Sequence, residues 1–355
     1  MQEIAAFLQN IRQRPHDDAP RLIFADWLEE RGDPRGEFIR LQCLRFGYTI
    51  GDARKSPLVE REQALLQRHR ERWVGPLLQR GIGWEFRRGL LHLRVGAAQF
   101  LRIDWEALTQ TETWEWVEKI AIRIEVSAEI DDYGTWEEVQ ASAAIRRPEE
   151  ALSMGTRIRE REARRIAENR RDFCAELQPL ADFPSLARME ALDLRNNNLG
   201  DDGTAILAAS PHVKGLRYLD LGFNRIGSSG SASIARSPNL AGLSTLKLDD
   251  NFLDYPDDRG VAALVAGPHP AQLVTLDLRW NAIGPIGARV LASSPALPRL
   301  ATLHLGNNAI GDAGAEALAA STHLPQLTEL HVEYNGLGAA AAAALQRRFG
   351  EGVYL

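Results

Sequence analysis

Cysteine is scarce in this chain of 355 residues, which contains only Cys43 and Cys174. Two cysteines cannot build a disulfide framework, and neither lies at a spacing typical of a metal site, so we expect a cytoplasmic protein without a bound metal. Long apolar runs are also missing, because no stretch approaches the roughly 20 apolar residues of a membrane span. The first residues carry no basic cluster and are soon interrupted by polar side chains, so we expect no secretory signal.

A strong excess of one charge is absent as well. Lysine and arginine number 42 against 48 aspartates and glutamates, and the net charge of −6 argues against general nucleic-acid binding. The chain also lacks the nucleophile-elbow, P-loop, zinc-protease and dinucleotide-binding signatures. We therefore expect no catalytic residues, no cofactor and no small-molecule substrate.

The chain does contain an internal repeat. Six asparagines recur at intervals of 27, 27, 30, 27 and 27 residues, each at the same place in a leucine-patterned segment: Asn197, Asn224, Asn251, Asn281, Asn308 and Asn335. Apolar and polar residues alternate just before each asparagine, which predicts a short strand with one apolar side. Such a strand must stack on its neighbour one repeat away, so we predict a parallel sheet along one wall of a continuous solenoid.

The residues after each strand predict a turn and then a helix. We expect each asparagine amide to point inward and to satisfy backbone groups that the bend leaves unpaired. Glycine-bounded turns such as 200–203 and 311–314 lead into helical segments. The pattern over residues 186–338 resembles the ribonuclease-inhibitor class of leucine-rich repeats. This resemblance implies an α/β horseshoe, with parallel strands on the concave side and helices on the convex side.

The spacing of apolar residues that defines the repeats continues upstream and downstream, so we assign residues 81–355 to the repeat domain. Two sets of apolar residues fit the strand template without the asparagine and define degenerate repeats over 90–124: Leu90, Leu93 and Val95, then Val117, Ile120 and Ile122. Residues 125–180 are interpreted as a repeat with a large insertion, and an interdomain linker is the alternative. Residues 339–355 are expected to form a C-terminal cap.

The 125–180 segment divides by charge. Residues 125–138 are rich in acids, whereas 146–171 are rich in arginines interspersed with glutamates. This pattern favours a solvated helical hairpin whose halves pair with each other. The alternative is an exposed basic half that contacts nucleic acid or an acidic partner.

Residues 1–80 are predicted to form a separate helical cap. Apolar residues at 4, 7, 8 and 11 form a helical stripe, and further helices are predicted over 20–31, after Asp33, and over about 58–73. Asp18 and Asp33 are the expected caps of the second and third helices. The run DDAPRLIFADWLEERGDPRGEFIRLQC at 17–43 resembles the short bacterial repeat-companion domain, a resemblance that implies a bacterial source and no transferable enzymatic activity.

The concave wall is the predicted partner-binding surface. Counting from the first leucine of each repeat, positions five, seven and eight are expected to be free of packing, and Trp, Tyr and Arg often anchor protein interfaces. The candidate residues are Asp193, Arg195, Asp220, Phe223, Lys247, Asp249, Asp277, Arg279, Trp280, His304, His331, Glu333 and Tyr334. The alternative for position eight is packing against the neighbouring loop. The glycine at position seven beside Phe223 is expected to leave room for a partner's side chain.

The third repeat has a longer, aspartate-rich turn over 249–258. Its carboxylates could bind a calcium ion or a basic partner, or the turn could be a solvated loop. We favour the solvated loop, because the spacing of the aspartates does not fit an EF-hand.

These features predict a monomeric, non-enzymatic protein-interaction module or scaffold. One alternative is an inhibitor or sensor that occludes a partner enzyme. Another is a catalytic N-terminal domain using His16, Asp17, Asp18 and Asp26, with the repeats choosing the substrate. Helix capping and ion pairing explain those side chains better.

Overall fold

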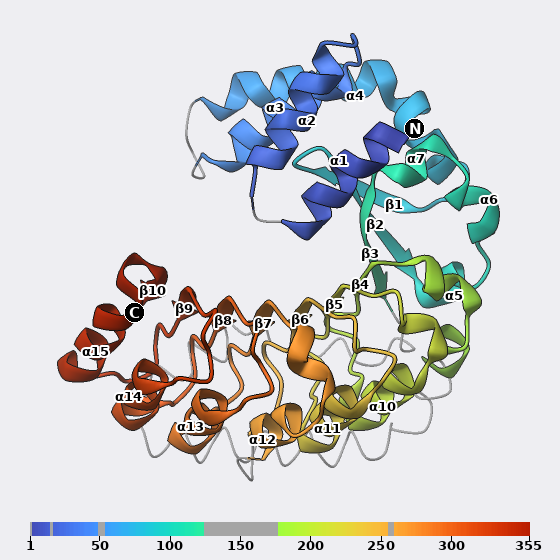
Figure 1. Ribbon diagram of the computed structural model, residues 1–355. Helices are drawn as coiled ribbons and strands as arrows, with labels where there is room; N and C mark the ends of the chain where they lie inside the picture. Colours follow the sequence, from blue (N-terminus) through green and yellow to red (C-terminus); the bar gives the residue numbers. More distant parts are fainter. Residues whose placement is uncertain (1, 15–16, 49–53, 124–176, 255–258) are drawn as a thin grey trace, which may run out of the picture.

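The computed structural model describes residues 2–14, 17–48, 54–123, 177–254 and 259–355. Figure 1 shows a C-shaped molecule, in which a curved row of strands backed by helices forms one arm and the N-terminal helices form the other. The predicted insertion at 125–180 falls almost wholly outside the described residues, as do His16, Cys174 and residues 255–258 of the aspartate-rich turn.

Within the described ranges one sheet contains ten strands in chain order. They are β1 (Gly83–Arg87), β2 (Leu90–Gly96), β3 (Val117–Arg123), β4 (Ala191–Asp193), β5 (Tyr218–Asp220), β6 (Thr245–Lys247), β7 (Thr275–Asp277), β8 (Thr302–His304), β9 (Glu329–His331) and β10 (Val353–Tyr354). From β2 onward every pair is parallel, and the central leucines of β4 to β9 lie in register. The predicted parallel solenoid is confirmed.

Strand β1 was not predicted. It pairs antiparallel with β2 through a two-residue turn at Arg88 and Gly89, both of which have positive φ, as a type I′ hairpin requires. A Cβ at Gly89 would lie 2.2 Å from the Ile39 side chain, so the turn also packs closely against the helical arm.

Helices form the outer layer behind the strands (Figure 1). They are α10 (Gly200–Ala209), α11 (Ser228–Arg236), α12 (Gly260–Val265), α13 (Pro285–Ser293), α14 (Gly311–Ala320) and α15 (Ala339–Phe349), with the 3₁₀ turns η1 (Pro184–Arg188), η2 (Pro211–Val213), η3 (His269–Gln272) and η4 (Gly350–Gly352). Leucines from strands and helices meet between the two layers, and one continuous core extends from Leu8 to Leu345.

The recurring asparagines form a hydrogen-bonded ladder inside the turns. Asn251 Oδ1 accepts bonds from the backbone N–H groups of Asn224 (3.1 Å) and Ile226 (2.8 Å) in the preceding repeat. Its Nδ2 donates to the carbonyls of Leu221 (3.0 Å) and Leu248 (2.9 Å). The other five repeat the pattern in whole or in part. The predicted role of the asparagine amide is confirmed.

The N-terminal arm consists of α1 (Gln2–Gln13), α2 (Ala19–Glu29), α3 (Arg35–Phe46) and α4 (Lys55–Leu78), and the short helices α5 (Ala97–Phe100), α6 (Trp105–Thr109) and α7 (Glu112–Glu115) connect β2 to β3. Helix α4 is longer than the predicted 58–73, because Val74 and Leu77 are buried and extend it through Pro76. Helix α2 ends two residues before the predicted 31.

The expected helix caps are partly wrong. Asp18 makes no cap bond, because its backbone is helical, and instead Asp17 Oδ1 accepts from Ala19 N at 2.9 Å. Asp18 pairs with Arg88 of the β1–β2 turn at 2.9 Å. Asp33 does accept a bond from Arg35 N at the start of α3 (2.9 Å). Asp26 pairs with Arg40, so its carboxylate has the ion-pairing role that the sequence suggests.

Buried charges join the N-terminal arm to the sheet. Arg21 of α2 is 1% exposed, and its Nη2 donates to Glu118 Oε1 of β3 at 2.8 Å. The other carboxylate oxygen of Glu118 lies 2.8 Å from His92 Nε2 of β2. Beside them Phe24 stacks on Trp116, with ring centroids 5.5 Å apart. The arm is therefore anchored to the first strands of the sheet.

Candidate partner-binding surface

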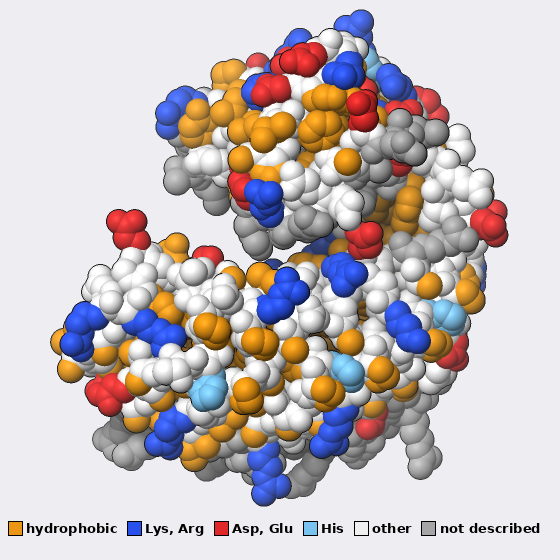
Figure 2. All heavy atoms as spheres, viewed as in Figure 1, with side chains coloured by type: hydrophobic (Ala, Val, Ile, Leu, Met, Phe, Trp, Pro, Cys, Tyr) orange, Lys and Arg blue, Asp and Glu red, His pale blue; other side chains and the backbone are white. Residues whose placement is uncertain are grey.

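The inner surface of the sheet is built by the residues between the buried leucines of each strand. At position five, Asp193, Asp220, Lys247, Asp277, His304 and His331 lie side by side on consecutive strands, and Tyr354 of β10 continues the row. This row faces the N-terminal arm (Figure 1), and Figure 2 shows a hollow between the two arms that opens near the C-terminal end. The inner surface divides into an N-terminal and a C-terminal tract.

In the N-terminal tract (Lys119, Asp193, Arg195, Tyr218, Asp220, Phe223, Lys247 and Asp249) the charges pair with one another. Arg195 Nη1 and Nη2 donate to the two carboxylate oxygens of Asp249 at 2.9 and 2.6 Å, across two repeats. Lys119 Nζ lies 2.7 Å from Asp193. Asp220 and Asp249 are only 4% and 3% exposed. The expectation that these positions are free of packing is therefore wrong for both aspartates, and it is also wrong for Asp277, which is 1% exposed.

Gly222 does not leave room for a partner. A Cβ at this position would lie 2.4 Å from Arg195 Nη1 and 2.7 Å from Asp249 Oδ1, because the ion pair crosses the inner surface directly over the glycine. The Arg195 guanidinium also lies over the Phe223 ring, 4.4 Å from its centroid. The chain itself occupies the space that the sequence assigned to a partner.

Tyr218, at position three, belongs to this tract but was not predicted. Its hydroxyl accepts from Lys119 Nζ and donates to Asp220 Oδ2, both at 3.2 Å, while Lys247 Nζ lies 5.8 Å from its ring centroid. Burial, and then the charge of Asp220, raises the pKa of Tyr218. The signal was present in the sequence, since position three follows the same two-residue alternation as position five.

In the C-terminal tract (Asp277, Arg279, Trp280, His304, Glu329, His331, Glu333, Tyr334 and Tyr354) most contacts stay within one strand. Arg279 donates to Asp277 of its own repeat at 2.9 and 2.6 Å. His331 lies between Glu329 (2.9 Å) and Glu333 (3.2 Å). The rings of His304, His331 and Tyr354 stack in a row, with centroids 4.3 and 4.1 Å apart. No ion pair bridges repeats here among the described residues.

Every residue at position eight adopts a left-handed backbone conformation. The φ values lie between 53° and 59° for Asn196, Phe223, Asp250, Trp280, Asn307 and Tyr334. Asparagine and aspartate tolerate this conformation, whereas an aromatic residue is strained by about 1–2 kcal/mol. Phe223, Trp280 and Tyr334 are nevertheless 41%, 39% and 82% exposed. The backbone therefore presents aromatic rings at the rim of the surface in alternate repeats.

His304 should make the stability of the protein sensitive to pH. Burial lowers its pKa from 6.5 to about 4. Below pH 6.5 the unfolded chain takes up a proton that the folded protein does not, so the free energy of unfolding falls as pH drops toward 4 and is unaffected above 6.5. We expect His304→Gln to lose less stability between pH 7 and 4.5 than the wild type in urea unfolding.

A second histidine serves as the control for that measurement. His323 is exposed and lies outside the strands, so His323→Gln reports the general effect of removing a histidine. An equal pH dependence of the wild type and His304→Gln would contradict the assignment.

The aspartate-rich turn shows no calcium site in its described part. Asp249 binds Arg195, and the Asp254 Oδ1 atom accepts from Val261 N at 2.9 Å. Across the described ranges no group of three His, Cys, Asp or Glu side chains is placed to hold a metal ion. None of the helices in these ranges combines the length and apolar character of a membrane-spanning segment.

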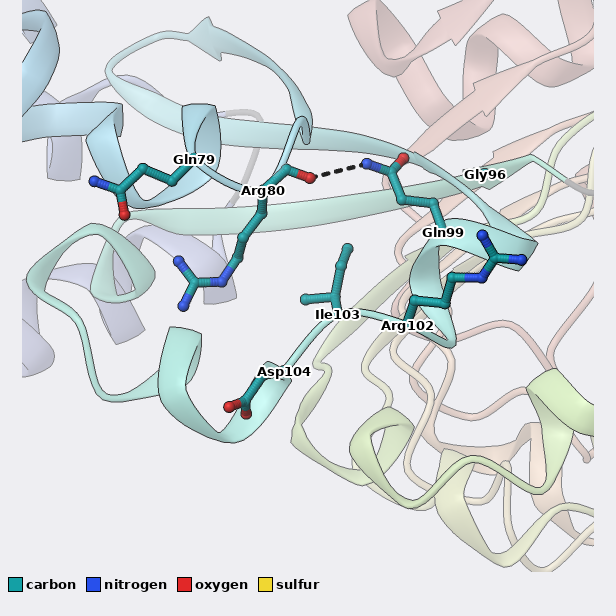
Figure 3. Close-up of a pocket in the computed structure, with 7 residues that line it drawn as sticks. All are labelled: Gln79, Arg80, Gly96, Gln99, Arg102, Ile103 and Asp104. Atoms are coloured by element: carbon teal, nitrogen blue, oxygen red, sulfur yellow. Dashed lines mark hydrogen bonds between the residues drawn. The ribbon is translucent and has the colours of Figure 1, made fainter.

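A shallow pocket lies away from the inner surface, where α4 ends near α5. Figure 3 shows its lining residues, Gln79, Arg80, Gly96, Gln99, Arg102, Ile103 and Asp104. Gln99 Nε2 donates to the Arg80 carbonyl at 3.1 Å, and Asp104 caps α6 through Ala107 N at 3.0 Å. These hydrogen bonds stabilise local structure, and none of the lining residues belongs to the predicted partner-binding surface.

Comparison with known proteins supports the repeat assignment. The family model "Leucine Rich repeat" matches residues 189–205, 216–235, 271–292 and 299–319. No curated protein matches the chain. Among solved structures, an internalin from Listeria monocytogenes strain 4b F2365 is 19% identical over 48% of this chain and 55% of its own, with a TM-score of 0.29. A TLR13–ssRNA13 complex is 17% identical over 49% and 28%, with a TM-score of 0.25. The chain thus spans about half or less of each.

Proposed function

We propose that this chain, whose repeats match a leucine-rich-repeat model, is a non-enzymatic interaction module or scaffold that binds a partner protein on the inner surface of its sheet. The observation that carries this proposal is the placement of Trp280 and Tyr334. Both are exposed aromatic residues in left-handed conformations, where asparagine would be less strained. Tryptophan and tyrosine are frequent anchors of protein interfaces.

The two tracts contribute differently to this function. In the N-terminal tract Arg195 contacts both Asp249 and Phe223, so these side chains stabilise the surface itself. In the C-terminal tract Tyr334 is 82% exposed and the side chain of Glu329 is 42% exposed. We therefore propose that the C-terminal tract makes the main contacts with the partner.

The test compares partner capture by the wild type and by Trp280→Asn/Tyr334→Asn. Asparagine suits the left-handed backbone and already occupies position eight in Asn196 and Asn307, so the double variant should fold as the wild type does. We expect it to bind the captured partner at least about tenfold more weakly, as measured by calorimetry, because truncating an anchor residue removes roughly 1–2 kcal/mol or more.

The matched control is Ile286→Asn, which removes a large exposed side chain (51% exposed) from α13 on the outer layer. This variant should bind as the wild type does. Equal capture by the wild type and the double variant would refute the assignment of the inner surface.

We further propose that the N-terminal arm is a bacterial repeat-companion domain and that the repeats are of the ribonuclease-inhibitor type. The run at 17–43 and the 27-residue period support these two assignments. The low cysteine content supports a cytoplasmic location. We propose a monomer, to be checked by sedimentation.

A further inference from the structure

We propose that the C-terminal tract recognises an arginine side chain of the partner, held by Glu333 above Gly306 and beside Tyr334. This inference rests on the proposed function and specifies the chemistry of the partner. The N-terminal tract already contains such a contact within the chain.

Arg195 shows how this surface holds a guanidinium group. The Arg195 side chain reaches from repeat one to repeat three, where its guanidinium forms two hydrogen bonds to Asp249 at 2.9 and 2.6 Å. Its Cζ atom lies 4.4 Å from the centroid of the Phe223 ring. Gly222 leaves room for this guanidinium, because a Cβ at position 222 would lie 2.4 Å from Arg195 Nη1. Two-point binding to a carboxylate together with stacking on a ring is a strong and arginine-specific mode.

The same sequence of residue types recurs three repeats later. At position seven, Arg195, Gly222 and Asp249 in repeats one to three correspond to Arg279, Gly306 and Glu333 in repeats four to six. At position eight the two halves differ: Phe223 shares its repeat with Gly222, whereas the repeat of Gly306 has Asn307 there, and Trp280 and Tyr334 supply aromatic rings in the repeats on either side. The residues for a second guanidinium site are therefore present.

The second site is not closed by the chain's own arginine. Arg279 donates through Nε and Nη2 to Asp277 of its own strand, at 2.9 and 2.6 Å. For Arg195 the corresponding carboxylate, Asp193, is already paired with Lys119 at 2.7 Å, and Asp193 accepts only the backbone N–H of Arg195. The competition for the nearest carboxylate thus explains why one arginine crosses two repeats and the other does not.

Glu333 is left with an oxygen directed over the glycine. Its Oε1 contacts His331 Nδ1 at 3.2 Å, whereas Oε2 would lie 3.1 Å from a Cβ at Gly306 and forms no hydrogen bond with another described residue. Tyr334 follows Glu333 in the chain and is 82% exposed. A carboxylate oxygen therefore lies over a position that has no side chain, and the next residue in the chain carries an exposed ring.

The charge of the tract selects a cation. Arg279 is neutralised by Asp277, whereas Glu329 and Glu333 share the single imidazole of His331. The tract thus retains net negative charge at neutral pH, and a guanidinium can satisfy it in the way Arg195 satisfies Asp249. Stacking against Tyr334 favours arginine over lysine, because the guanidinium is planar and weakly hydrated.

The experiment uses the full chain and a library of random peptides selected against it. Peptides that bind the wild type but not Trp280→Asn define ligands of the inner surface. We expect arginine to be enriched in them at one position. Each selected peptide is then synthesised with that arginine or with citrulline, which has nearly the same shape but no charge, and both are titrated against the wild type and Glu333→Gln.

For the wild type, citrulline should weaken binding by about tenfold or more, the effect of losing a charge-assisted pair of hydrogen bonds. For Glu333→Gln the arginine peptide should already bind about as weakly, and the two peptides should differ by less than about threefold. The control Glu316→Gln, which removes an exposed carboxylate from α14, should retain the full difference.

The outcomes separate the two proposals. Peptides that depend on Trp280 but show no arginine preference, or that keep the arginine preference in Glu333→Gln, would overturn this inference and leave the inner surface as the binding site. A library that yields no peptide dependent on Trp280 would count against both.

Discussion

Replacing Asn251 by alanine is expected to lower the free energy of unfolding by about 3–5 kcal/mol. The side chain is 3% exposed and bonds two backbone N–H groups and two carbonyls in the middle of the array. Alanine has no group that could replace these bonds, and leaving buried backbone groups unpaired is more destabilising than losing an average hydrogen bond. The measurement is urea unfolding followed by circular dichroism.

Asn308→Ala is the matched comparison. Asn308 makes the same kinds of bonds, accepting from Asn281 N and Ile283 N and donating to Leu278 O and Leu305 O, but it is only partly buried. Water can replace some of these partners, so we expect a smaller loss than for Asn251. A loss below about 1 kcal/mol for Asn251→Ala would show that the asparagine ladder does not hold the repeats together.

Replacing Arg21 by methionine is expected to destabilise the protein by about 3–5 kcal/mol, because it leaves Glu118 buried without its strongest charge partner. Burial alone would raise the pKa of Glu118, but the bond with His92 and the charge of Arg21 outweigh it and lower the pKa. Arg21 also donates to the Asp17 carbonyl at 3.1 Å, so the substitution removes a hydrogen bond at the start of α2. Urea unfolding measures the loss.

The double variant Arg21→Met/Glu118→Leu tests the explanation. If the single variant is less stable because Glu118 has lost its guanidinium partner, removing the Glu118 carboxylate as well should recover most of the lost stability. A double variant as unstable as the single one would show that Arg21 acts through packing and not through its charge. In either case the C-terminal tract, where we propose that a partner binds, lies on strands distant from β3 and should retain its affinity.

On the inner surface the positions of the side chains could be predicted from the sequence, but their pairing could not. The register of position five follows from the repeat period alone, which is sufficient to place Asp277, His304 and His331 side by side. The pairing of Arg195 with Asp249 does not follow from the period, because it depends on which of several carboxylates the side chain reaches. The left-handed backbone at position eight could not be predicted either, because the repeat pattern contains no information on φ angles.

The repeat pattern was sufficient to predict the solenoid, the parallel sheet, the outer helices and the inward-pointing asparagine amides. A fixed period forces equivalent residues onto adjacent strands, so their contacts repeat and can be read from one copy. Three features could be seen only in the folded protein: the N-terminal arm joins the sheet through Arg21 and Glu118, an ion pair covers Gly222, and no ion pair between described residues covers the equivalent Gly306. These outcomes depend on competition between side chains distant in sequence, which periodicity does not encode.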